Sequence, residues 1–449
     1  MIKRRFELDF FSWKTASARR PMVLRGARQV GKSFAVQAFA KAHFQNLVEV
    51  NFEARPDLKS VFTNLNVVKI CRELSGLFNA QIEPGKTLLF LDEIQECPQA
   101  LLALRYFFEE MPNLHVVAAG SLLDLLLNDP HEGLRVPVGR IEYRYLHPIN
   151  FREFLDALGE SGLSAAISKI SLKDPFSEAL HLRALSLLGE YLQVGGMPAA
   201  VEMFQQQRAT TRFRELQASI QQTYRDDFRK YRGRIDADLL EECYRRLPFY
   251  ATKKFKYNEL LPDTQSRTTR RVLDLFEMAR AITKIHRTAG NGLPLDGERV
   301  VNDYKYIAVD IGILNNSLQL PLITGTAWNT YFVHSGVLAE QFVGQELLSH
   351  APSFTEPRLY YWQREQNNSN AQVDFLIAHS GKVIPLEVKA GSTGNLKSLR
   401  TFMEGKNSAI GVRISQHELS FHDRILSVPL YAVSELERLI DECLMLVMA

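Results

Sequence analysis

The chain has 449 residues, of which 46% are hydrophobic and 23% are charged, and its formal net charge is +3. This composition is that of an ordinary globular protein and excludes a disordered chain, while the length predicts about three domains rather than one. No apolar run reaches the roughly eighteen residues of a membrane span, and the N-terminus lacks the apolar stretch of a signal peptide. We therefore expect a cytoplasmic protein with no membrane partner.

The first predicted elements surround a phosphate-binding loop. Residues 22–24 form a short apolar strand, and residues 34–40 have the pattern of a helix. Between them stands the complete pattern G-x-x-x-x-G-K-S, made by Gly26, Ala27, Arg28, Gln29, Val30, Gly31, Lys32 and Ser33. In such a loop backbone N–H groups bind phosphates, the lysine reaches the β- and γ-phosphates, and the hydroxyl binds Mg²⁺. We expect these residues to bind ATP, with Lys32 also catalytic and Ser33 a metal ligand.

An unbroken apolar run at residues 87–91 predicts a buried parallel strand that ends in Asp92 and Glu93. The carboxyl ends of such strands carry the ligand-binding groups of α/β sheets. We interpret the pair as a Walker B motif in which Asp92 holds Mg²⁺ and Glu93 polarises the attacking water. A third strand, residues 115–120, ends at Ser121. This serine either senses the γ-phosphate or caps the next helix, and both interpretations stay open.

The middle of the chain is locally basic, with sixteen Lys or Arg against ten Asp or Glu between residues 225 and 287. Such an excess is either an electrostatic footprint for nucleic acid or an ordinary solvated surface. Net charge alone does not choose between them.

The same segment has the layout of a helix-turn-helix. Residues 258–261 precede a Pro-Asp turn, and a second helix, capped by Ser266, carries apolar residues at helical spacing from Val272 onward. Strand-like residues 281–285 and 304–309 follow and complete the pattern of a winged helix. Winged helices serve either DNA binding or protein docking.

A second constellation lies near the C-terminus, on two predicted strands joined by the turn Ser380-Gly381. Residues two apart in a strand share a face, so Glu387 and Lys389 point the same way and Asp374 approaches from the neighbouring strand. Asp374 and Glu387 suit Mg²⁺, Lys389 can orient or deprotonate an attacking water, and an upstream helix offers Glu340 as a further ligand. The spacing is that of a PD-(D/E)xK nuclease, but a salt-bridged surface hairpin has the same pattern.

The order of these segments resembles one family, the bacterial and archaeal AAA-type ATPases whose C-terminal domain of unknown function has a restriction-endonuclease-like core. The shared segments are residues 26–33, 90–95, 119–121, 138–140, 147–154, 191–198, 306–312, 361–362, 373–375 and 386–389. The resemblance spans about residues 20 to 405 and implies an additional-strand, catalytic-glutamate ATPase. It also implies that Arg140 acts as an arginine finger or sensor, in its own or a neighbouring subunit. The chain has Gln363 and Gln372 where the family has Arg and Glu, which alters the charge of the nuclease-like site.

These assignments predict an α/β protein of four parts. They are a P-loop ATPase core with a doubly wound parallel sheet at 1–150, a helical lid at 151–235, a winged helix at 236–295, and a restriction-endonuclease-like domain at 296–449. The expected function is a Mg²⁺-dependent ATPase whose nucleotide cycle regulates a nucleic-acid-binding C-terminal domain with a candidate nuclease site, DNA being favoured over RNA. The alternative is a nucleotide-gated protein-interaction switch whose nuclease-like domain is an inactive scaffold. A homo-oligomer or a protein partner fits either hypothesis.

Overall fold

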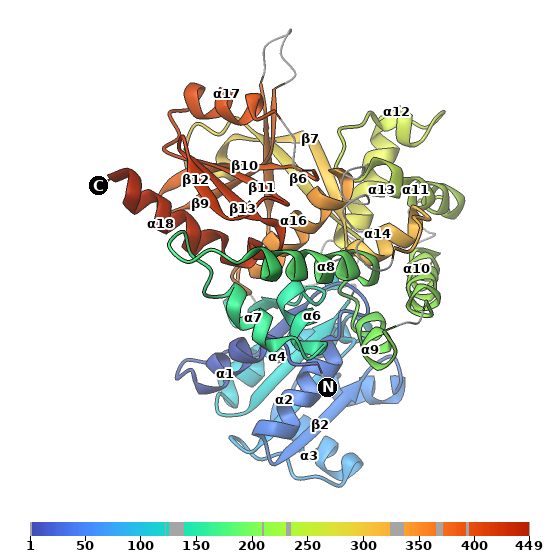
Figure 1. Ribbon diagram of the computed structural model, residues 1–449. Coiled ribbons are helices and arrows are strands. Elements are labelled where there is room, and N and C mark those ends of the chain that lie inside the picture. The colour runs from blue at the N-terminus through green and yellow to red at the C-terminus, as the bar shows by residue number, and fades with distance from the viewer. Residues whose placement is uncertain are drawn as a thin grey trace.

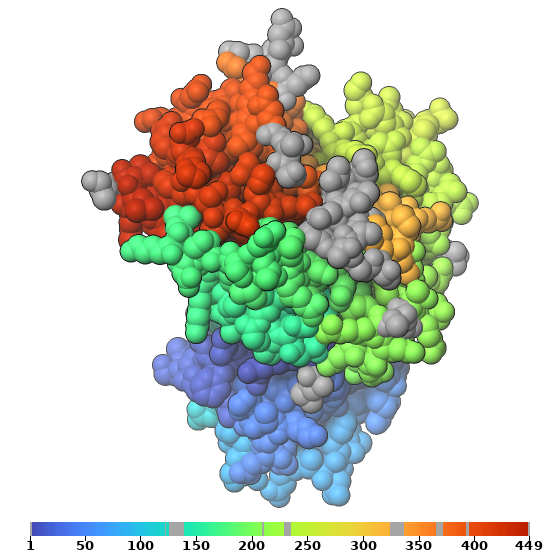
Figure 2. All heavy atoms as spheres, viewed as in Figure 1, coloured from blue at the N-terminus to red at the C-terminus, as the bar shows by residue number. Residues whose placement is uncertain are grey.

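The computed structural model describes residues 2–121, 123–124, 139–208, 211–229, 235–323, 336–364, 371–391 and 395–448. Figure 1 shows an N-terminal sheet with its helices at the bottom, helices across the middle, and a second sheet at the top. In the space-filling view the green helical layer lies between the blue N-terminal residues and the red C-terminal residues (Figure 2). Within these ranges the structure contains no helix that is both long and apolar enough to cross a membrane.

The N-terminal sheet has five parallel strands in the order β2-β3-β4-β1-β5. They are β1 (Met22–Arg25), β2 (Asn46–Asn51), β3 (Thr87–Asp92), β4 (His115–Gly120) and β5 (Glu142–Tyr145). Every residue of β3 and β4 is buried, because helices cover both faces of the sheet.

The covering helices are α1 (Glu7–Thr15), α2 (Lys32–His43), α3 (Val67–Phe78) and α4 (Pro98–Glu110), with short turns η1 (Pro56–Phe62) and η2 (Ile94–Glu96). Leu88 and Phe90 pack into one core with α1 and α2, whereas Leu89 and Leu91 pack into another with α3 and α4. This alternation follows from the two-residue period of a strand. The predicted doubly wound α/β sheet is confirmed.

The helical layer follows directly. It consists of α6 (Phe151–Ala157), α7 (Ser161–Ile167), α8 (Glu178–Val194), α9 (Pro198–Gln206) and α10 (Phe213–Arg229). Helix α6 begins at a capping box, in which the Asn150 side chain accepts from the Glu153 N–H at 2.9 Å and the Glu153 carboxylate accepts from the Asn150 N–H at 3.2 Å. The box fixes the chain direction where it leaves the ATPase sheet.

Three further helices, α11 (Ala237–Tyr250), α12 (Tyr257–Leu260) and α13 (Ser266–Met278), occupy the predicted helix-turn-helix segment. The apolar residues predicted to repeat along α13 are all buried. Helix α13 begins at Ser266 itself, with Gln265 in the N-cap position and no side-chain capping bond. The prediction that Ser266 caps this helix is therefore wrong.

The second sheet has eight strands in the order β12-β13-β11-β10-β9-β8-β6-β7. They are β6 (Ile282–Thr288), β7 (Arg299–Ala308), β8 (Leu359–Gln363), β9 (Gln372–His379), β10 (Lys382–Val388), β11 (Gly411–Ser415), β12 (Ser420–His422) and β13 (Ile425–Pro429). The remaining elements are η3 (Leu295–Glu298), α14 (Ile311–Ser317), α16 (Gly336–His350), α17 (Lys397–Gly405), η5 (Leu430–Glu435) and α18 (Leu436–Met448).

The strands expected to form a wing belong to this second sheet. Strand β6 pairs antiparallel with β7 and parallel with β8, so it is hydrogen-bonded on both sides rather than forming a free-standing hairpin. The predicted boundary at residue 295 falls between β6 and β7, inside one continuous sheet. A winged helix that is separate from the C-terminal domain therefore does not match the structure.

Two segments far apart in the sequence meet where the helical layer joins the second sheet. The Gly196 N–H donates to Asp310 Oδ2 at 2.6 Å, and Asp310 Oδ1 accepts the Ile313 N–H at 3.0 Å. Gly195 has a φ of 74°, and a Cβ there would collide with Asp310 and with the Gly312 backbone. Only glycine fits this contact.

Candidate functional site

The phosphate-binding loop connects β1 to α2, as predicted. Its backbone is left-handed at Gln29, with a φ of 63°, and at Gly31, with a φ of 90°. Such a turn directs successive N–H groups into one concavity at a helix N-terminus, which is an anion site. Lys32 is buried, and its Nζ donates to the carbonyl oxygens of Gly26 at 3.0 Å and Ala27 at 2.8 Å. The lysine thus lies against the loop whose phosphate it is expected to bind.

Two of the predicted nucleotide-binding residues turn their side chains toward the helical layer. Arg28 Nη1 lies 2.8 Å from Asp227 Oδ2, and Gln29 Nε2 donates to Thr223 Oγ1 at 3.3 Å. Both partners belong to α10. We therefore expect Arg28 and Gln29 to bind phosphate through their backbone N–H groups, while their side chains join the loop to α10. Val30 is buried, and we expect the same backbone role for it.

Ser33 and Asp92 converge at the carboxyl end of β3. Ser33 Oγ donates to Asp92 Oδ2 at 2.8 Å, and Asn51 Nδ2 donates to the same oxygen at 3.2 Å. Burial raises the pKa of Asp92, and the Ser33 hydrogen bond opposes that rise. A hydroxyl and a carboxylate in contact are hard oxygen ligands, so this pair fits Mg²⁺. Sequence reasoning missed Asn51, although it ends the strand beside Asp92 in register.

The carboxylates of Asp92 and Glu93 also affect the pKa of Lys32. Burial lowers its pKa to about 8, while the charges of Glu93 and Asp92 raise it. The lysine and the carboxylates therefore form one electrostatic unit around the loop.

Glu93 follows Asp92 in a left-handed conformation, with a φ of 49°, which turns its side chain out of the strand direction. Gln95 Nε2 donates to Glu93 Oε2 at 2.6 Å, so Gln95 positions the predicted catalytic carboxylate. A Cβ on Gly120, at the end of β4, would collide with the Gln95 side chain. Gln95 is thus a site residue that sequence reasoning missed.

Ser121 lies at the end of β4. Its Oγ is buried and has no hydrogen-bond partner among the described residues. The helix it was expected to cap, residues 122–127, lies largely outside the described residues. Both the sensor role and the capping role stay predictions.

Arg140 lies far from the loop. It immediately precedes β5, which runs parallel to β1 with Glu142 opposite Met22. Arg140 is therefore at the amino end of the sheet, whereas the phosphate-binding loop leaves its carboxyl end. Its Nε donates to Glu109 Oε1 at 2.9 Å. A finger or sensor role within the same subunit is wrong; a role in a neighbouring subunit stays a prediction, and Val138 of that segment lies outside the described residues.

A cavity of about 660 Å³ opens beside the loop, between the two sheets. Gly26 and Ala27 line one side, and Arg280, from the α13–β6 connection, lines the other. Asp124 pairs with Arg280 at 2.7 Å and with Arg25 at 2.9 Å across this space. Residues that follow the helical layer in the chain thus lie across this cavity from the start of the phosphate-binding loop.

The predicted nuclease residues also come together. Asp374 lies on β9, Glu387 on β10 and Glu340 on α16. Lys389 Nζ donates to Glu387 Oε1 at 2.5 Å, and the Val388 N–H donates to Asp374 Oδ2 at 2.8 Å. Burial raises the pKa of Glu340 and of Glu387 to about 7, and the Asp374 charge adds to both rises.

Lys305, on β7, joins this cluster and was missed by sequence reasoning. Its Nζ lies 3.2 Å from Glu340 Oε2 and 3.9 Å from Asp374 Oδ1. In the part of the chain that the structure describes, no group of three or more His, Cys, Asp or Glu side chains is arranged to hold a metal ion. Glu340 has a lysine as its ion-pair partner, so its role as a metal ligand stays a prediction.

The fold and the loop geometry define a P-loop nucleoside triphosphatase. Residues 18–155 match a family model described as an AAA domain, so the protein contains an AAA-type ATPase domain, for which ATP is the expected nucleotide. Residues 185–322 and 335–433 match two models described as domains of unknown function, DUF8612 and DUF4143. No curated protein sequence matches the chain.

Several solved structures show weak similarity. RuvB of Thermotoga maritima, titled a Holliday junction branch migration motor, is 15% identical, with 63% of this chain and 90% of that chain covered at a TM-score of 0.27. ORC1 of Aeropyrum pernix, in complex with DNA, is 12% identical (72% and 93% covered, TM-score 0.28). AMPPCP-bound DnaA of Aquifex aeolicus is 11% identical (61% and 86% covered, TM-score 0.28). These TM-scores are too low to support any functional conclusion.

Proposed function

We propose that the protein is a Mg²⁺-dependent ATPase whose nucleotide cycle regulates a nucleic-acid-binding C-terminal domain with a restriction-endonuclease-like core. The observation that carries this proposal is that one helix, α16, contributes to both regions. Glu340 belongs to the carboxylate cluster, which consists of Glu340, Asp374 and Glu387 with the lysines Lys305 and Lys389. Glu346, less than two turns later, accepts the backbone N–H of Phe151 at 2.9 Å, where the ATPase domain meets the helical layer.

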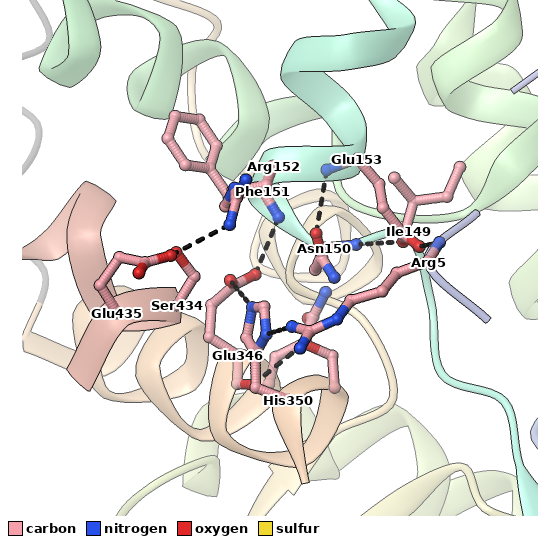
Figure 3. A network of polar contacts seen from close by, with 12 residues as sticks. Arg5, Ile149, Asn150, Phe151, Arg152, Glu153, Glu346, His350, Ser434 and Glu435 are labelled. Atoms are coloured by element: carbon pink, nitrogen blue, oxygen red, sulfur yellow. Dashed lines mark hydrogen bonds and ion pairs between the residues drawn. The ribbon is translucent and has the colours of Figure 1, made fainter. Parts of the chain in front are cut away.

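Figure 3 shows the polar contacts around Glu346. One ring nitrogen of His350 lies 3.2 Å from Glu346 Oε2, and the other lies 2.8 Å from Arg5 Nη1. The Arg5 N–H donates to Glu153 Oε1 at 2.6 Å. The N-terminal segment, the first turn of α6 and the last turns of α16 therefore share one hydrogen-bonded network.

Arg4 extends this network to the phosphate-binding loop. Its Nε lies 3.1 Å from Glu153 Oε2, and its Nη1 donates to the carbonyl oxygen of Val30 at 3.2 Å. Loss of γ-phosphate contacts on hydrolysis alters such loops, and a packed network converts small shifts into a second arrangement. We expect the nucleotide state to bias α16, and with it the cluster, through Arg4 and Glu153.

Exposed basic residues favour nucleic acid as the partner. Arg267 and Arg271 project from the exposed face of α13. Lys254 Nζ donates to Gln363 Oε1 at 2.9 Å on β8, the strand next to the one that carries Asp374. Exposed cations of this kind would bind phosphates without regard to base sequence.

The part of the carboxylate cluster around Glu387 favours a metal-dependent nuclease site. Glu387 is buried, and its Oε2 has no hydrogen-bond partner among the described residues. A buried carboxylate oxygen without a partner is costly unless a cation binds it. Asp374 and Glu387 would hold Mg²⁺, which when bound polarises a phosphodiester and activates water. Lys389 keeps Glu387 oriented through its hydrogen bond.

Cleavage of labelled DNA and RNA tests this function. We expect the wild type to cut in Mg²⁺ or Mn²⁺ with a rate that depends on ATP, and Glu387→Gln to lose cleavage while keeping ATPase activity. Glu404→Gln, an exposed position on α17, is the matched control. Equal cleavage by Glu387→Gln and wild type would refute the nuclease site.

The regulatory link needs its own test. Glu346→Ala removes the acceptor of the Phe151 N–H, so we expect the ATPase rate to stay within a few-fold while ATP no longer alters cleavage or nucleic-acid affinity. Glu404→Ala should behave as the wild type. ATP control that survives in Glu346→Ala would show that α16 does not carry it.

One observation favours the alternative, a nucleotide-gated protein-interaction switch with an inactive nuclease-like scaffold. Lys305 already neutralises part of the cluster from inside the protein. If no variant or wild type cuts any nucleic acid, and ATP instead changes binding to a protein in a salt-insensitive way, this alternative replaces the first proposal.

A further inference from the structure

The cluster contains a cation of its own. Lys305 is fully buried, and its Nζ lies 5.2 Å from the centre of the Tyr361 ring. The ammonium lies between two carboxylates, 3.2 Å from Glu340 Oε2 and 3.9 Å from Asp374 Oδ1. A buried ammonium needs paired negative charge, and these two residues supply it.

The two sides of the cluster differ in how their oxygens are satisfied. On the Glu340 side, Lys305 pairs with both carboxylates. On the other side, Lys389 takes only Glu387 Oε1, and Glu387 Oε2 stays buried without a partner among the described residues. The side chain of Glu387 is only 6% exposed, so water does not replace that partner freely. The unpartnered oxygen points to a ligand, and its chemistry points to a divalent cation.

We propose that Lys305 takes the place of a second cation, so that the cluster binds one divalent cation, on the Glu387 side, and Glu340 is not a ligand. Mg²⁺ and Mn²⁺ require oxygen ligands at about 2.1 Å, and an ammonium at hydrogen-bonding distance from Glu340 and Asp374 excludes such an ion between them. The lysine supplies one positive charge at a fixed position. This inference rests on the proposed nuclease-like character of the domain but not on cleavage.

Counting bound Mn²⁺ in the full-length protein tests it. All variants carry Asp92→Asn, which removes the carboxylate at the ATPase site, and no nucleotide is added. We expect one bound Mn²⁺ per chain, measured from the electron paramagnetic resonance signal of the free ion. Glu387→Gln should lose this ion, whereas Glu340→Gln should keep its affinity within about three-fold, which corresponds to about 0.7 kcal/mol. We expect Lys305→Gln to gain a second ion.

Glu340→Gln keeps the test decisive even if Lys305→Gln does not fold, because it changes no charge that the bound ion would contact. Loss of the ion in Glu340→Gln, or no ion in the wild-type cluster, would overturn the inference. A single ion in a folded Lys305→Gln would overturn it as well. One Mn²⁺ without any cleavage would leave the inference standing and refute only the nuclease function.

Discussion

The ATPase site and the carboxylate cluster use the same residue types in opposite ways. In the ATPase site, the Lys32 ammonium donates to backbone carbonyl oxygens. Within the described residues, the Asp92 and Glu93 carboxylates accept hydrogen bonds from hydroxyl and amide donors rather than from a lysine. In the cluster, Lys305 and Lys389 pair directly with carboxylates. The first site is therefore prepared for an anionic ligand that brings its own metal ion, whereas the second balances most of its charge internally. Both sites contain lysine and carboxylate side chains, but they differ in whether the lysine pairs with a carboxylate or with a backbone carbonyl.

The largest effect is expected from Glu93→Gln, which tests whether the ATPase site hydrolyses ATP with Glu93 as the general base. Removing the general base should lower kcat by about 100- to 10,000-fold while ATP stays bound. Steady-state phosphate release and equilibrium nucleotide binding measure the two properties separately. Glu96→Gln, on the following turn, is the control. Wild-type turnover in Glu93→Gln would remove Glu93 from the mechanism.

Lys32→Ala tests the binding half of the same site. The variant loses a buried ammonium that is expected to hold the β- and γ-phosphates, so ATP affinity should fall by about 100-fold or more. Titration with a fluorescent ATP analogue measures it. Lys41→Ala removes an exposed lysine from the same helix and should bind normally. Unchanged affinity in Lys32→Ala would contradict the phosphate-binding role.

The sequence predicted the ATPase site better than the C-terminal region for a physical reason. Residues 26–33 and 87–93 are local motifs, in which the loop, the strand and the ligand groups are contiguous in the chain. Asn51 and Lys305 contact their sites only through residues distant in the sequence, so no spacing rule predicts them. Gln95 is close to Glu93 in the sequence, but only the folded turn shows that its side chain contacts that carboxylate. Strands β6 and β7 resemble a wing locally, and only their pairing with β8 makes them part of a sheet.

The expected role of Arg140 within its own subunit does not fit the structure for a related reason. Its neighbours in the sequence match an ATPase pattern, but the direction of β5 decides at which edge of the sheet it lies. Strand direction is a property of the assembled sheet, not of the segment. Placing a distant arginine therefore requires the topology.

A smaller effect is expected at Asp310, which joins the helical layer to the region of the second sheet. Complete burial raises its pKa to about 6, against hydrogen bonds from Gly196 and Ile313. Because the folded pKa lies above the unfolded value, the stabilisation is complete below about pH 4 and is lost as pH rises through about 6, a change of about 3 kcal/mol. Asp310→Asn should flatten this pH dependence in urea unfolding.

The same variant should lose about 1–3 kcal/mol at pH 5, because an amide N–H would face a backbone N–H donor. Asp423→Asn, at an exposed turn, should keep the wild-type profile. A wild-type pH dependence in Asp310→Asn would assign the titration to another group and weaken the view that this contact holds the two regions together.

The smallest effect concerns the surface that is proposed to bring nucleic acid to the cluster. Arg267→Ala and Arg271→Ala each remove one exposed cation, so each should weaken binding a few-fold and reduce the slope of log affinity against log salt by about 0.7 to 0.9. Fluorescence anisotropy with one DNA and one RNA of equal length, across a salt series, measures both quantities. Arg72→Ala, exposed on α3 of the ATPase domain, should leave the slope unchanged. A slope that falls equally in all three variants would mean that nucleic acid binds by diffuse attraction over the whole protein. The cluster would then have no dedicated route to a phosphodiester, and its two lysines would be better explained as structural counter-charges.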